Sequence, residues 1–345
     1  MRNQVLAVLF IMGIAGPACA ASGHAVSYKI TQTVPLGAPD RWDYLQYDAA
    51  SDRVYVAHGD EVTVVDGTSG KLIGNITGMP GGTHGIVVSH ATKQGFTDDG
   101  KAGEVAVFDP VTLQVTKRIK AEPDADGIVL DETSGHIFVI DGDSAKITVI
   151  DPKTDNVIAT IDGGGGLEAG LSGNNGKLYV DGAEKNEMVR VDTATNAVDA
   201  HWPMQGCVTP RGIAFDAAHH RLFASCGSKV MIVLDADSGK QLASLPIDQG
   251  SDGAGFDPGL GLAFSSNFAG NISVIAEKSP SQFEALAPIP TQLGARTMTL
   301  NPKTHRLYVV TADIAIDPSA APTDYRHRFK IAPGTARLLF LDPAK

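Results

Sequence analysis

The chain has 345 residues with a formal net charge of −11, and it contains 38 glycines, 19 prolines and only 6% aromatic residues. The charge includes no basic block, so a polyanionic nucleic-acid partner is not expected. The length would suit two average domains, but all-β domains often run longer than average. The repeats described below place residues 21–345 in one domain.

The N-terminal residues have the layout of a secretory signal peptide. Arg2 supplies a positive charge, residues 5–15 are apolar, and residues 18–20 form a small-residue cleavage site. The apolar run of about 11 residues is shorter than the roughly 20 that a membrane-spanning helix needs. We therefore predict cleavage after Ala20, a periplasmic or secreted protein, and no transmembrane segment. A lipid anchor on Cys19 is the alternative.

One sequence pattern recurs along the mature chain: an apolar strand that ends in Asp, a polar turn, and a second apolar strand. The copies occupy residues 62–76, 105–119, 147–161, 188–202 and 231–245, and their turn aspartates are Asp66, Asp109, Asp151, Asp192 and Asp235. A degenerate copy at 272–286 carries Glu277 at the turn position. The period of about 42 residues is typical of propeller blades. The turn aspartates are expected to be structural, because Asp hydrogen-bonds the backbone of its own turn.

A second pattern precedes each of these copies and marks another strand. A basic residue is followed by an aliphatic and an aromatic residue at 53–55, 136–138, 177–179, 221–223 and 306–308. Each period thus contains four short strands separated by Gly, Asp, Asn and Pro, and helical periodicity is nearly absent. Four antiparallel strands per period form one blade of a β-propeller.

The two ends of the chain predict how the ring closes. The last period stops after its third strand at residues 337–341, whereas residues 28–35 form a strand before the first blade opens at Asp43. The N-terminal strand would then complete the last blade. We predict an all-β, seven-bladed propeller of four-stranded antiparallel blades, closed by the N-terminal strand and monomeric, with six or eight blades as alternatives.

Two cysteines, Cys207 and Cys226, remain after the predicted cleavage. An even pair in an oxidising compartment favours one disulfide. Two buried thiols are the alternative. A metal pair is less favoured, because neither His nor Cys stands at ligand spacing beside either cysteine.

The repeats resemble the YVTN repeats of bacterial YncE-like propellers over nearly the whole mature chain. The resemblance rests on the strand–Asp–turn–strand copies, on residues 42–44 and 294–298, on Cys207 and Cys226 bracketing Pro210, and on residues 330–334. It implies an exported binding or interaction protein without one established activity. Similar repeats also occur in subunits of quinoprotein dehydrogenases, so an accessory role in such a system is a further reading.

Alignment of the repeats places one residue of each blade just before the innermost strand, at the mouth of the channel. These residues are Asp43, His84, Asp126, Glu168 or Ala169, Arg211, Asp252 and Arg296. Convergent charges in a concavity are candidates for a functional site. The neighbouring glycines, such as Gly85 and Gly212, are expected to leave the mouth uncrowded for a ligand.

Three interpretations of this ring stay open. Arg211 and Arg296 could bind the carboxylate or phosphate of a small anionic ligand. A divalent cation could instead be held by Asp43, His84, Asp126 and Asp252. In the third, the charges pair with one another across the channel.

No catalytic residue is predicted from the sequence, because it lacks the G-x-S-x-G, H-E-x-x-H and C-x-x-C-H motifs. A binding protein or a scaffold for a periplasmic partner is favoured, and a metal-assisted lyase or hydrolase with His84 as base is the alternative.

The long loop between Thr311 and Arg337 is a candidate lid or partner-docking element, because long loops in propellers are often functional. It carries Tyr325, Arg326, His327 and Arg328. A structural cap or disorder is the other expectation. Two further groups are expected to be solvated. One is the polar loops after the second strands (His58, Asp60, Asp98, Asp99, Asp141, Asp143, Asp181, Glu184, Asn267), and the other is the turn histidines of the opposite face (His219, His220, His305).

Overall fold

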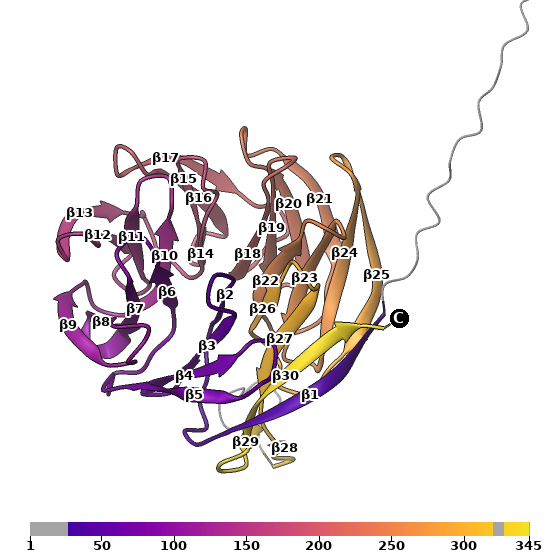
Figure 1. Cartoon of the computed structure of the whole chain (residues 1–345). Helices are drawn as coiled ribbons and strands as arrows, with labels where there is room; N and C mark the ends of the chain where they lie inside the picture. Colours follow the sequence, from indigo (N-terminus) through magenta and orange to yellow (C-terminus); the bar gives the residue numbers. More distant parts are fainter. Residues whose placement is uncertain (1–26, 320–327, 345) are drawn as a thin grey trace, which may run out of the picture.

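Seven four-stranded antiparallel sheets are arranged in a ring (Figure 1), and residues of their innermost strands line a central cavity. The computed structural model describes residues 27–319 and 328–344. The predicted signal peptide and the loop residues Tyr325, Arg326 and His327 lie outside these ranges. A short 3-10 turn, η1 (Gly100–Ala102), lies among the strands. The all-β, seven-bladed prediction is confirmed.

The first three blades follow one another in sequence, each running from the channel outward. Blade 1 comprises β2 (Leu45–Asp48), β3 (Arg53–His58), β4 (Glu61–Asp66) and β5 (Leu72–Thr77). Blade 2 comprises β6 (Ile86–Ser89), β7 (Gln94–Asp99), β8 (Glu104–Phe108) and β9 (Val115–Lys120). Blade 3 comprises β10 (Ala125–Asp131), β11 (His136–Asp141), β12 (Lys146–Asp151) and β13 (Asn156–Asp162).

The next three blades have the same order of strands. Blade 4 comprises β14 (Gly170–Ser172), β15 (Lys177–Gly182), β16 (Glu187–Asp192) and β17 (Ala197–Pro203). Blade 5 comprises β18 (Pro210–Asp216), β19 (Arg221–Cys226), β20 (Val230–Asp235) and β21 (Gln241–Pro246). Blade 6 comprises β22 (Ser251–Asp257), β23 (Leu262–Asn267), β24 (Asn271–Ser279) and β25 (Gln282–Pro290).

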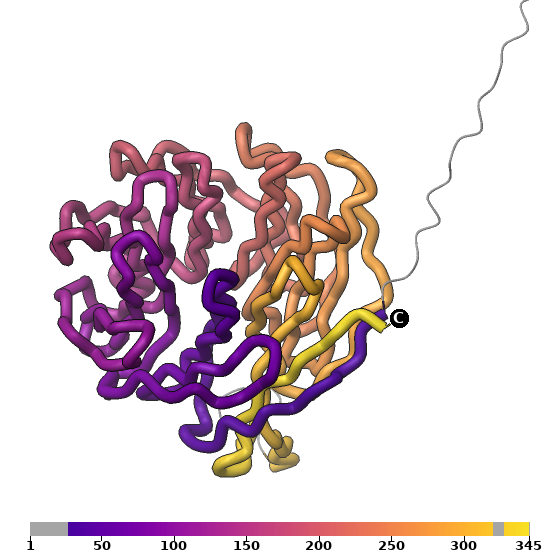
Figure 2. The backbone as a smooth tube through the Cα atoms, in the orientation of Figure 1, coloured from indigo at the N-terminus to yellow at the C-terminus, as the bar shows by residue number. Residues whose placement is uncertain are grey.

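Blade 7 joins the two ends of the described chain. It contains β26 (Met298–Asn301), β27 (Arg306–Thr311), β30 (Ala336–Pro343) and, as its outermost strand, β1 (Tyr28–Gly37). β1 and β30 run antiparallel and side by side, with Tyr28 opposite Pro343 (Figure 2). The predicted closure of the ring by the N-terminal strand is therefore confirmed. The segment between β27 and β30 contributes a separate hairpin of β28 (Ile314–Ile316) and β29 (Phe329–Ile331).

The core lies between neighbouring blades, and the strand sequences explain why. The second and third strands are apolar along nearly their whole length and are buried on both faces, as in β3 and β12, because each blade is sandwiched between two others. Outer strands such as β17 alternate between exposed and partly buried residues. Seven hydrophobic clusters result, one at each junction of consecutive blades, including the junction of blades 7 and 1.

The expected turn role of the repeated aspartates is confirmed. Asp66 Oδ1 accepts a hydrogen bond from the Ser69 backbone N–H at 2.7 Å, and Asp109 Oδ1 accepts one from Val111 at 2.7 Å. Such bonds satisfy the turn backbone at the connections between third and fourth strands in blades 1 to 5. The basic residues of the second pattern each begin the second strand of a blade, as Arg53 does in β3.

The predicted disulfide joins Cys207 to Cys226, with the two Cα atoms 5.4 Å apart. It ties the connection between β17 and β18 to the end of β19. Disulfides persist mainly in oxidising compartments, so this bond is compatible with a location outside the cytoplasm. In the described ranges, no helix has the length and apolar character needed to cross a bilayer.

Candidate binding site at the channel mouth

The seven predicted ring positions stand where each blade begins, and several of their side chains contact one another. Asp126, Arg211 and Asp252 lie inside β10, β18 and β22 at register shifts, where one residue of the inner strand has no partner in the second strand. Such β-bulges redirect a side chain away from the plane of the sheet. In blade 4 it is Glu168, and not Ala169, that takes part, because its carboxylate reaches Arg211.

Asp252 is the centre of the cationic half of the ring. Its two carboxylate oxygens lie 2.7 Å from Arg296 Nη1 and 3.4 Å from Arg211 Nη1. Arg211 Nη1 also lies 3.1 Å from Glu168 Oε1. The Asp252 side chain is 8% exposed, whereas Arg211 and Arg296 are 40% and 35% exposed. The carboxylate is therefore enclosed, while both guanidinium groups retain faces that a ligand can reach.

His84 belongs to a second group on the other side of the ring. Its Nδ1 lies 2.6 Å from Asp98 Oδ2 and 3.7 Å from Asp126 Oδ1, and its Nε2 lies 3.0 Å from Arg41 Nη2. Burial alone would lower the pKa of His84, but the hydrogen bond and charge of Asp98, with Asp43 and Asp126, raise it to about 9. A protonated His84 has no lone pair to accept from Arg41. Arg41 is exposed and also lines the pocket at the channel mouth.

The remaining carboxyl groups of the ring bind protons more tightly than usual. Burial is the largest cause: it raises the pKa of Asp43 to about 6 and that of Glu168 to about 7, although Arg296 and Arg211 respectively act in the opposite direction. Burial, followed by the charge of Asp43, also raises the pKa of Asp126 well above its ordinary value. The negative charge of the ring thus decreases as pH falls from 8 toward 6.

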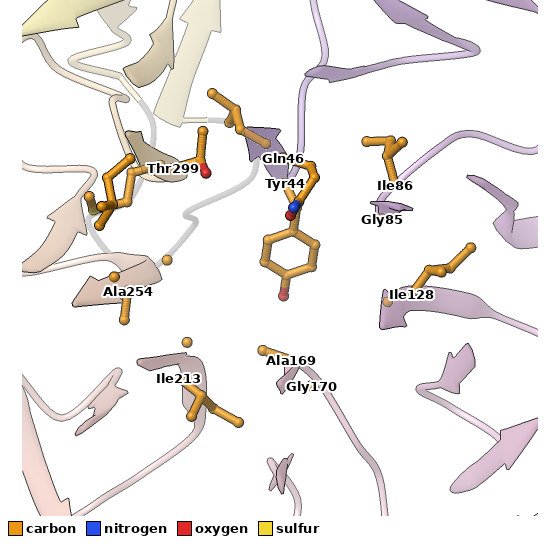
Figure 3. Close-up of a pocket in the computed structure, with 17 residues that line it drawn as sticks. Tyr44, Gln46, Gly85, Ile86, Ile128, Ala169, Gly170, Ile213, Ala254 and Thr299 are labelled. Carbon is orange, nitrogen blue, oxygen red and sulfur yellow. The ribbon is translucent and has the colours of Figure 1, made fainter. Parts of the chain in front are cut away.

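Tyr44 is a channel residue that the ring alignment did not identify. Its ring points into the middle of the channel, between the inner strands that carry Ile86, Ile128 and Ile213 (Figure 3). The surrounding cavity has a volume of about 250 Å³. Burial, followed by the charges of Glu168, Asp126, Asp252 and Asp43, raises the pKa of the Tyr44 hydroxyl well above 10. The residue therefore contributes a neutral hydroxyl next to the ring carboxylates.

A larger pocket opens above the cationic half of the ring. It has a volume of about 750 Å³, and its charged lining includes Arg41, Arg211, Asp252 and Arg296. The apolar lining is formed by Phe268, Ile314, Phe329 and Ile331, together with Trp42, and Asp40, Gln249 and Ser251 add further polar groups. Phe329 and Ile331 are two residues apart in β29 and so project from the same face of that strand. This volume lies in the range of small-molecule sites.

The hairpin of β28 and β29 lies within the segment between Thr311 and Arg337 that was predicted to form a lid. Its apolar residues form a wall of the pocket, and the ring centroids of Phe268 and Phe329 are 4.5 Å apart. Arg328 is the one predicted lid residue within the described ranges, and its Cζ lies 5.8 Å from the Phe329 ring centroid. Tyr325, Arg326 and His327 lie outside those ranges. The sequence signal for this wall was the alternation of apolar residues on both sides of the loop.

Two expectations about the surroundings of the ring are corrected. Six residues expected in solvated rim loops are instead buried at the ends of the second strands: His58, Asp98, Asp99, Asp141, Asp181 and Asn267. Asp60, Asp143 and Glu184 are exposed as expected. Asp98, for example, accepts hydrogen bonds from the backbone N–H groups of His84 and Gly85.

The glycines that follow the ring residues do not simply clear space for a ligand. A Cβ atom on Gly85 would lie 2.5 Å from the Ile128 backbone nitrogen, and one on Gly212 would lie 2.9 Å from that of Ala254. These glycines let neighbouring inner strands approach each other closely. The narrow channel depends on them.

The expected cation set does not form one cluster. Asp252 is engaged by two arginines and His84 by Asp98. Among the described residues, ligand atoms of His, Cys, Asp or Glu converge within 4.8 Å at a different place, Asp216, His219 and Glu277. The pairing that was the third interpretation of the ring does occur, but between adjacent blades.

Comparison with known proteins supports the assignment of the fold and identifies no ligand or reaction. The model of a domain of unknown function, DUF5074, matches residues 48–256. Similar solved structures include "Crystal Structure of Mitotic Checkpoint Complex" (15% identity, TM-score 0.72, covering 100% of both chains) and "Structure of U3-55K" (10% identity, TM-score 0.73, covering 92% of this chain and 98% of that one). No curated protein matches the sequence. The resemblance to YncE-like repeats is supported at the level of the seven-bladed fold and not by a family match.

Proposed function

Because the DUF5074 model matches more than half of the chain, the protein belongs to that family, and we propose that its propeller binds a small anionic ligand in the channel-mouth pocket. The observation that carries the proposal is that three arginines and several large apolar side chains line one pocket of about 750 Å³, together with the carboxylates of Asp40 and Asp252. Such a site suits a carboxylate or phosphate attached to an apolar or aromatic body.

The polar face is suited to one anionic group at a time. Arg211 and Arg296 share the single carboxylate of Asp252 on their inner sides. A ligand carboxylate could therefore bind their exposed faces without breaking these ion pairs. Charge-assisted hydrogen bonds from two guanidinium groups are strong and directional. Arg41 lies on the same pocket wall and adds a third cation.

The apolar face sets the second requirement for the ligand. Phe268 and the hairpin residues Ile314, Phe329 and Ile331 line the same pocket as the arginines. Burial of apolar ligand surface against them contributes about 25 cal/mol per Å². A ligand with both parts is preferred over inorganic phosphate, which would use only the arginines.

Export to the periplasm or the outside of the cell belongs to the same proposal. It is supported by the signal-peptide pattern of residues 1–20 and by the disulfide. Intact-mass spectrometry of protein recovered from its native compartment should show a mature chain beginning at Ala21. A chain that retains residues 1–20 would contradict export by this route.

The binding proposal can be tested with defined probes. Thermal-shift measurements would compare benzoate, indole-3-acetate, phenyl phosphate and inorganic phosphate, followed by calorimetry on any compound that raises Tm. Arg296→Gln and Arg211→Gln should each weaken binding about tenfold or more, since each removes a charge-assisted contact of about 1.5–3 kcal/mol. Arg118→Gln is the matched control, because Arg118 is 36% exposed and ion-paired to Asp99 but does not line the pocket.

Two results would contradict the proposal. One is that no aromatic carboxylate or phosphate raises Tm in the wild-type protein. The other is that the Arg211 and Arg296 variants bind the best probe as tightly as the Arg118 variant does.

A further inference from the structure

Three side chains of metal-ligating type converge at the far end of blade 5 from the pocket. Asp216 ends β18, five residues after Arg211, which corresponds to about 17 Å of extended strand. His219 follows in the turn to β19, and Glu277 comes from β24 of blade 6. The ligand atoms of these three residues lie within 4.8 Å of one another. His219 was expected to be a solvated turn residue, but its Nδ1 faces two carboxylates.

Two carboxylates face the same nitrogen atom of His219. His219 Nδ1 lies 2.6 Å from Asp216 Oδ2 and 3.1 Å from Glu277 Oε1. This nitrogen carries at most one hydrogen, so it cannot donate a full hydrogen bond to both carboxylates. Asp216 has compensation elsewhere, since its oxygens accept from the backbone N–H groups of Ala218 and His219 at 3.0 and 3.2 Å.

Glu277 has no comparable compensation. Its side chain is only 2% exposed, and neither carboxylate oxygen has a hydrogen-bond partner among the described residues. Arg221 is the nearby cation, but its Nη1 donates to Asp235 and its Nε to the Pro280 carbonyl. A buried carboxylate is costly when its neighbouring imidazole, here His219 at 3.1 Å, already shares its Nδ1 with Asp216. A bound cation would remove that cost.

The sequence of blade 6 explains why Glu277 points inward. In the other repeats this position is an aspartate that hydrogen-bonds its own turn, as Asp235 does with Ser238. In blade 6, β24 continues through Glu277 to Ser279, so the residue lies within a strand and its longer side chain reaches the turn of blade 5. Loss of the turn motif thus coincides with a carboxylate directed at His219.

We propose that Asp216 Oδ2, His219 Nδ1 and Glu277 Oε1 bind one divalent transition-metal ion of the zinc class and link blade 5 to blade 6. One imidazole and two carboxylates form a ligand set that zinc accepts, with water in the remaining position. Zinc–ligand bonds of about 2.0–2.1 Å at tetrahedral angles place ligand atoms about 3.3 Å apart. Small side-chain rotations would open the present distances of 2.6 and 3.1 Å to this value. His219 is 46% exposed, which leaves the water position open to solvent.

The test uses the untagged mature chain after treatment with EDTA and dialysis. Calorimetric titration with ZnCl₂, MnCl₂ and CaCl₂ would measure stoichiometry and affinity, and the visible absorption of added Co²⁺ would report the ligand field. The variants are Glu277→Gln, which keeps the size of the side chain, and His219→Ala. The matched control is His305→Ala, because His305 Nδ1 lies 2.8 Å from Asp257 Oδ2 in the corresponding turn of the ring, without a third ligand nearby among the described residues.

We expect one Zn²⁺ per chain, tighter binding of zinc than of calcium, and a Tm that rises on zinc addition. Glu277→Gln and His219→Ala should each weaken zinc binding at least tenfold, while His305→Ala should not. The proposal is overturned if zinc binds without one-to-one saturation, or if the Glu277 variant binds zinc as the wild type does. It is also overturned if zinc leaves the wild-type Tm unchanged, in which case Asp216 and Glu277 share a proton instead.

Discussion

Asp252 holds two positive charges in place at the mouth of the channel, with oxygens 2.7 Å from Arg296 and 3.4 Å from Arg211. At the scale of single residues, this arrangement creates a conflict between stability and binding. The carboxylate neutralises the guanidinium groups in the folded protein, and its negative charge also repels an anionic ligand that binds their exposed faces. The same side chain should therefore have opposite effects on the two properties.

Asp252→Asn should lower the free energy of unfolding by about 1–3 kcal/mol, because it leaves charged donors with weaker partners. The same substitution should strengthen binding of the anionic probe, because both arginines lose a competing charge. Urea denaturation and calorimetry on one preparation would measure the two effects. An Asn variant that loses stability and affinity together would show that Asp252 serves to position the arginines.

Glu277 leads to a prediction about pH. Burial, followed by the charge of Asp216, raises its pKa to about 7. When folding raises the pKa of a carboxyl group, the folded protein holds the proton more tightly than the unfolded chain does. The resulting contribution to the free energy of unfolding is fully present below the unfolded pKa, near 4.5, and is lost as pH rises through the folded pKa, about 7. In EDTA, Glu277→Gln should thus have a Tm close to wild type at pH 5 and a higher Tm at pH 8.

The control for this experiment is Glu284→Gln, which removes a carboxylate that is 59% exposed on the neighbouring strand β25. The difference in Tm between this variant and the wild type should stay nearly constant between pH 5 and pH 8. If the Glu277 and Glu284 variants show the same pH dependence, then the burial of Glu277 does not govern its ionisation.

At the scale of structural elements, the connection between β17 and β18 is held by a covalent bond. Cys207 in this connection is joined to Cys226 at the end of β19, 19 residues later. Both cysteines are buried in the hydrophobic cluster between blades 4 and 5. The same connection leads directly to Pro210 and Arg211, so the disulfide also restrains the approach to the pocket.

The double variant Cys207→Ser/Cys226→Ser should lower the free energy of unfolding by about 2–4 kcal/mol, mainly because the unfolded chain loses a loop constraint of about 20 residues. Urea denaturation would measure this change, and the wild type in dithiothreitol should match the double variant. A reduced wild type as stable as the oxidised one would contradict the prediction.

At the scale of the whole molecule, stability depends on closure. Each hydrophobic cluster uses residues from two consecutive blades, and the cluster between blades 7 and 1 includes Val34 of β1. Tyr28 of the same strand contributes to the cluster between blades 6 and 7. A ring that lacks β1 would expose the edge of β30 and part of both clusters. The N-terminal strand is therefore required by the whole ring and not by blade 7 alone.

Deletion of residues 28–37 should abolish the cooperative unfolding transition or cause aggregation. A synthetic peptide with the sequence YKITQTVPLG should restore a transition when it is added during refolding, because it can pair with β30. Circular dichroism and size-exclusion chromatography would follow both steps. A scrambled peptide is the control, and normal cooperative folding of the truncated chain by itself would rule out this requirement for closure.

The sequence by itself determined the repeating framework of this protein. The period, the turn aspartates, the basic residues that begin the second strands, the closing strand and the cysteine pair are local patterns or repeats of one pattern. Each follows from backbone chemistry or from the need to bury both faces of a blade. The same alignment also identified which residue of each blade faces the channel mouth, except for the choice between Glu168 and Ala169.

Only the tertiary structure decided how those residues interact. The sharing of Asp252 by two arginines, the position of Tyr44 in the channel, the burial of Asp98 and the contact of Glu277 with His219 join side chains from different blades or different strands. A repeat pattern specifies the backbone of each blade separately. Charge pairing and burial depend instead on distances of a few ångströms between residues that lie far apart in the sequence, and these distances are set when the ring closes.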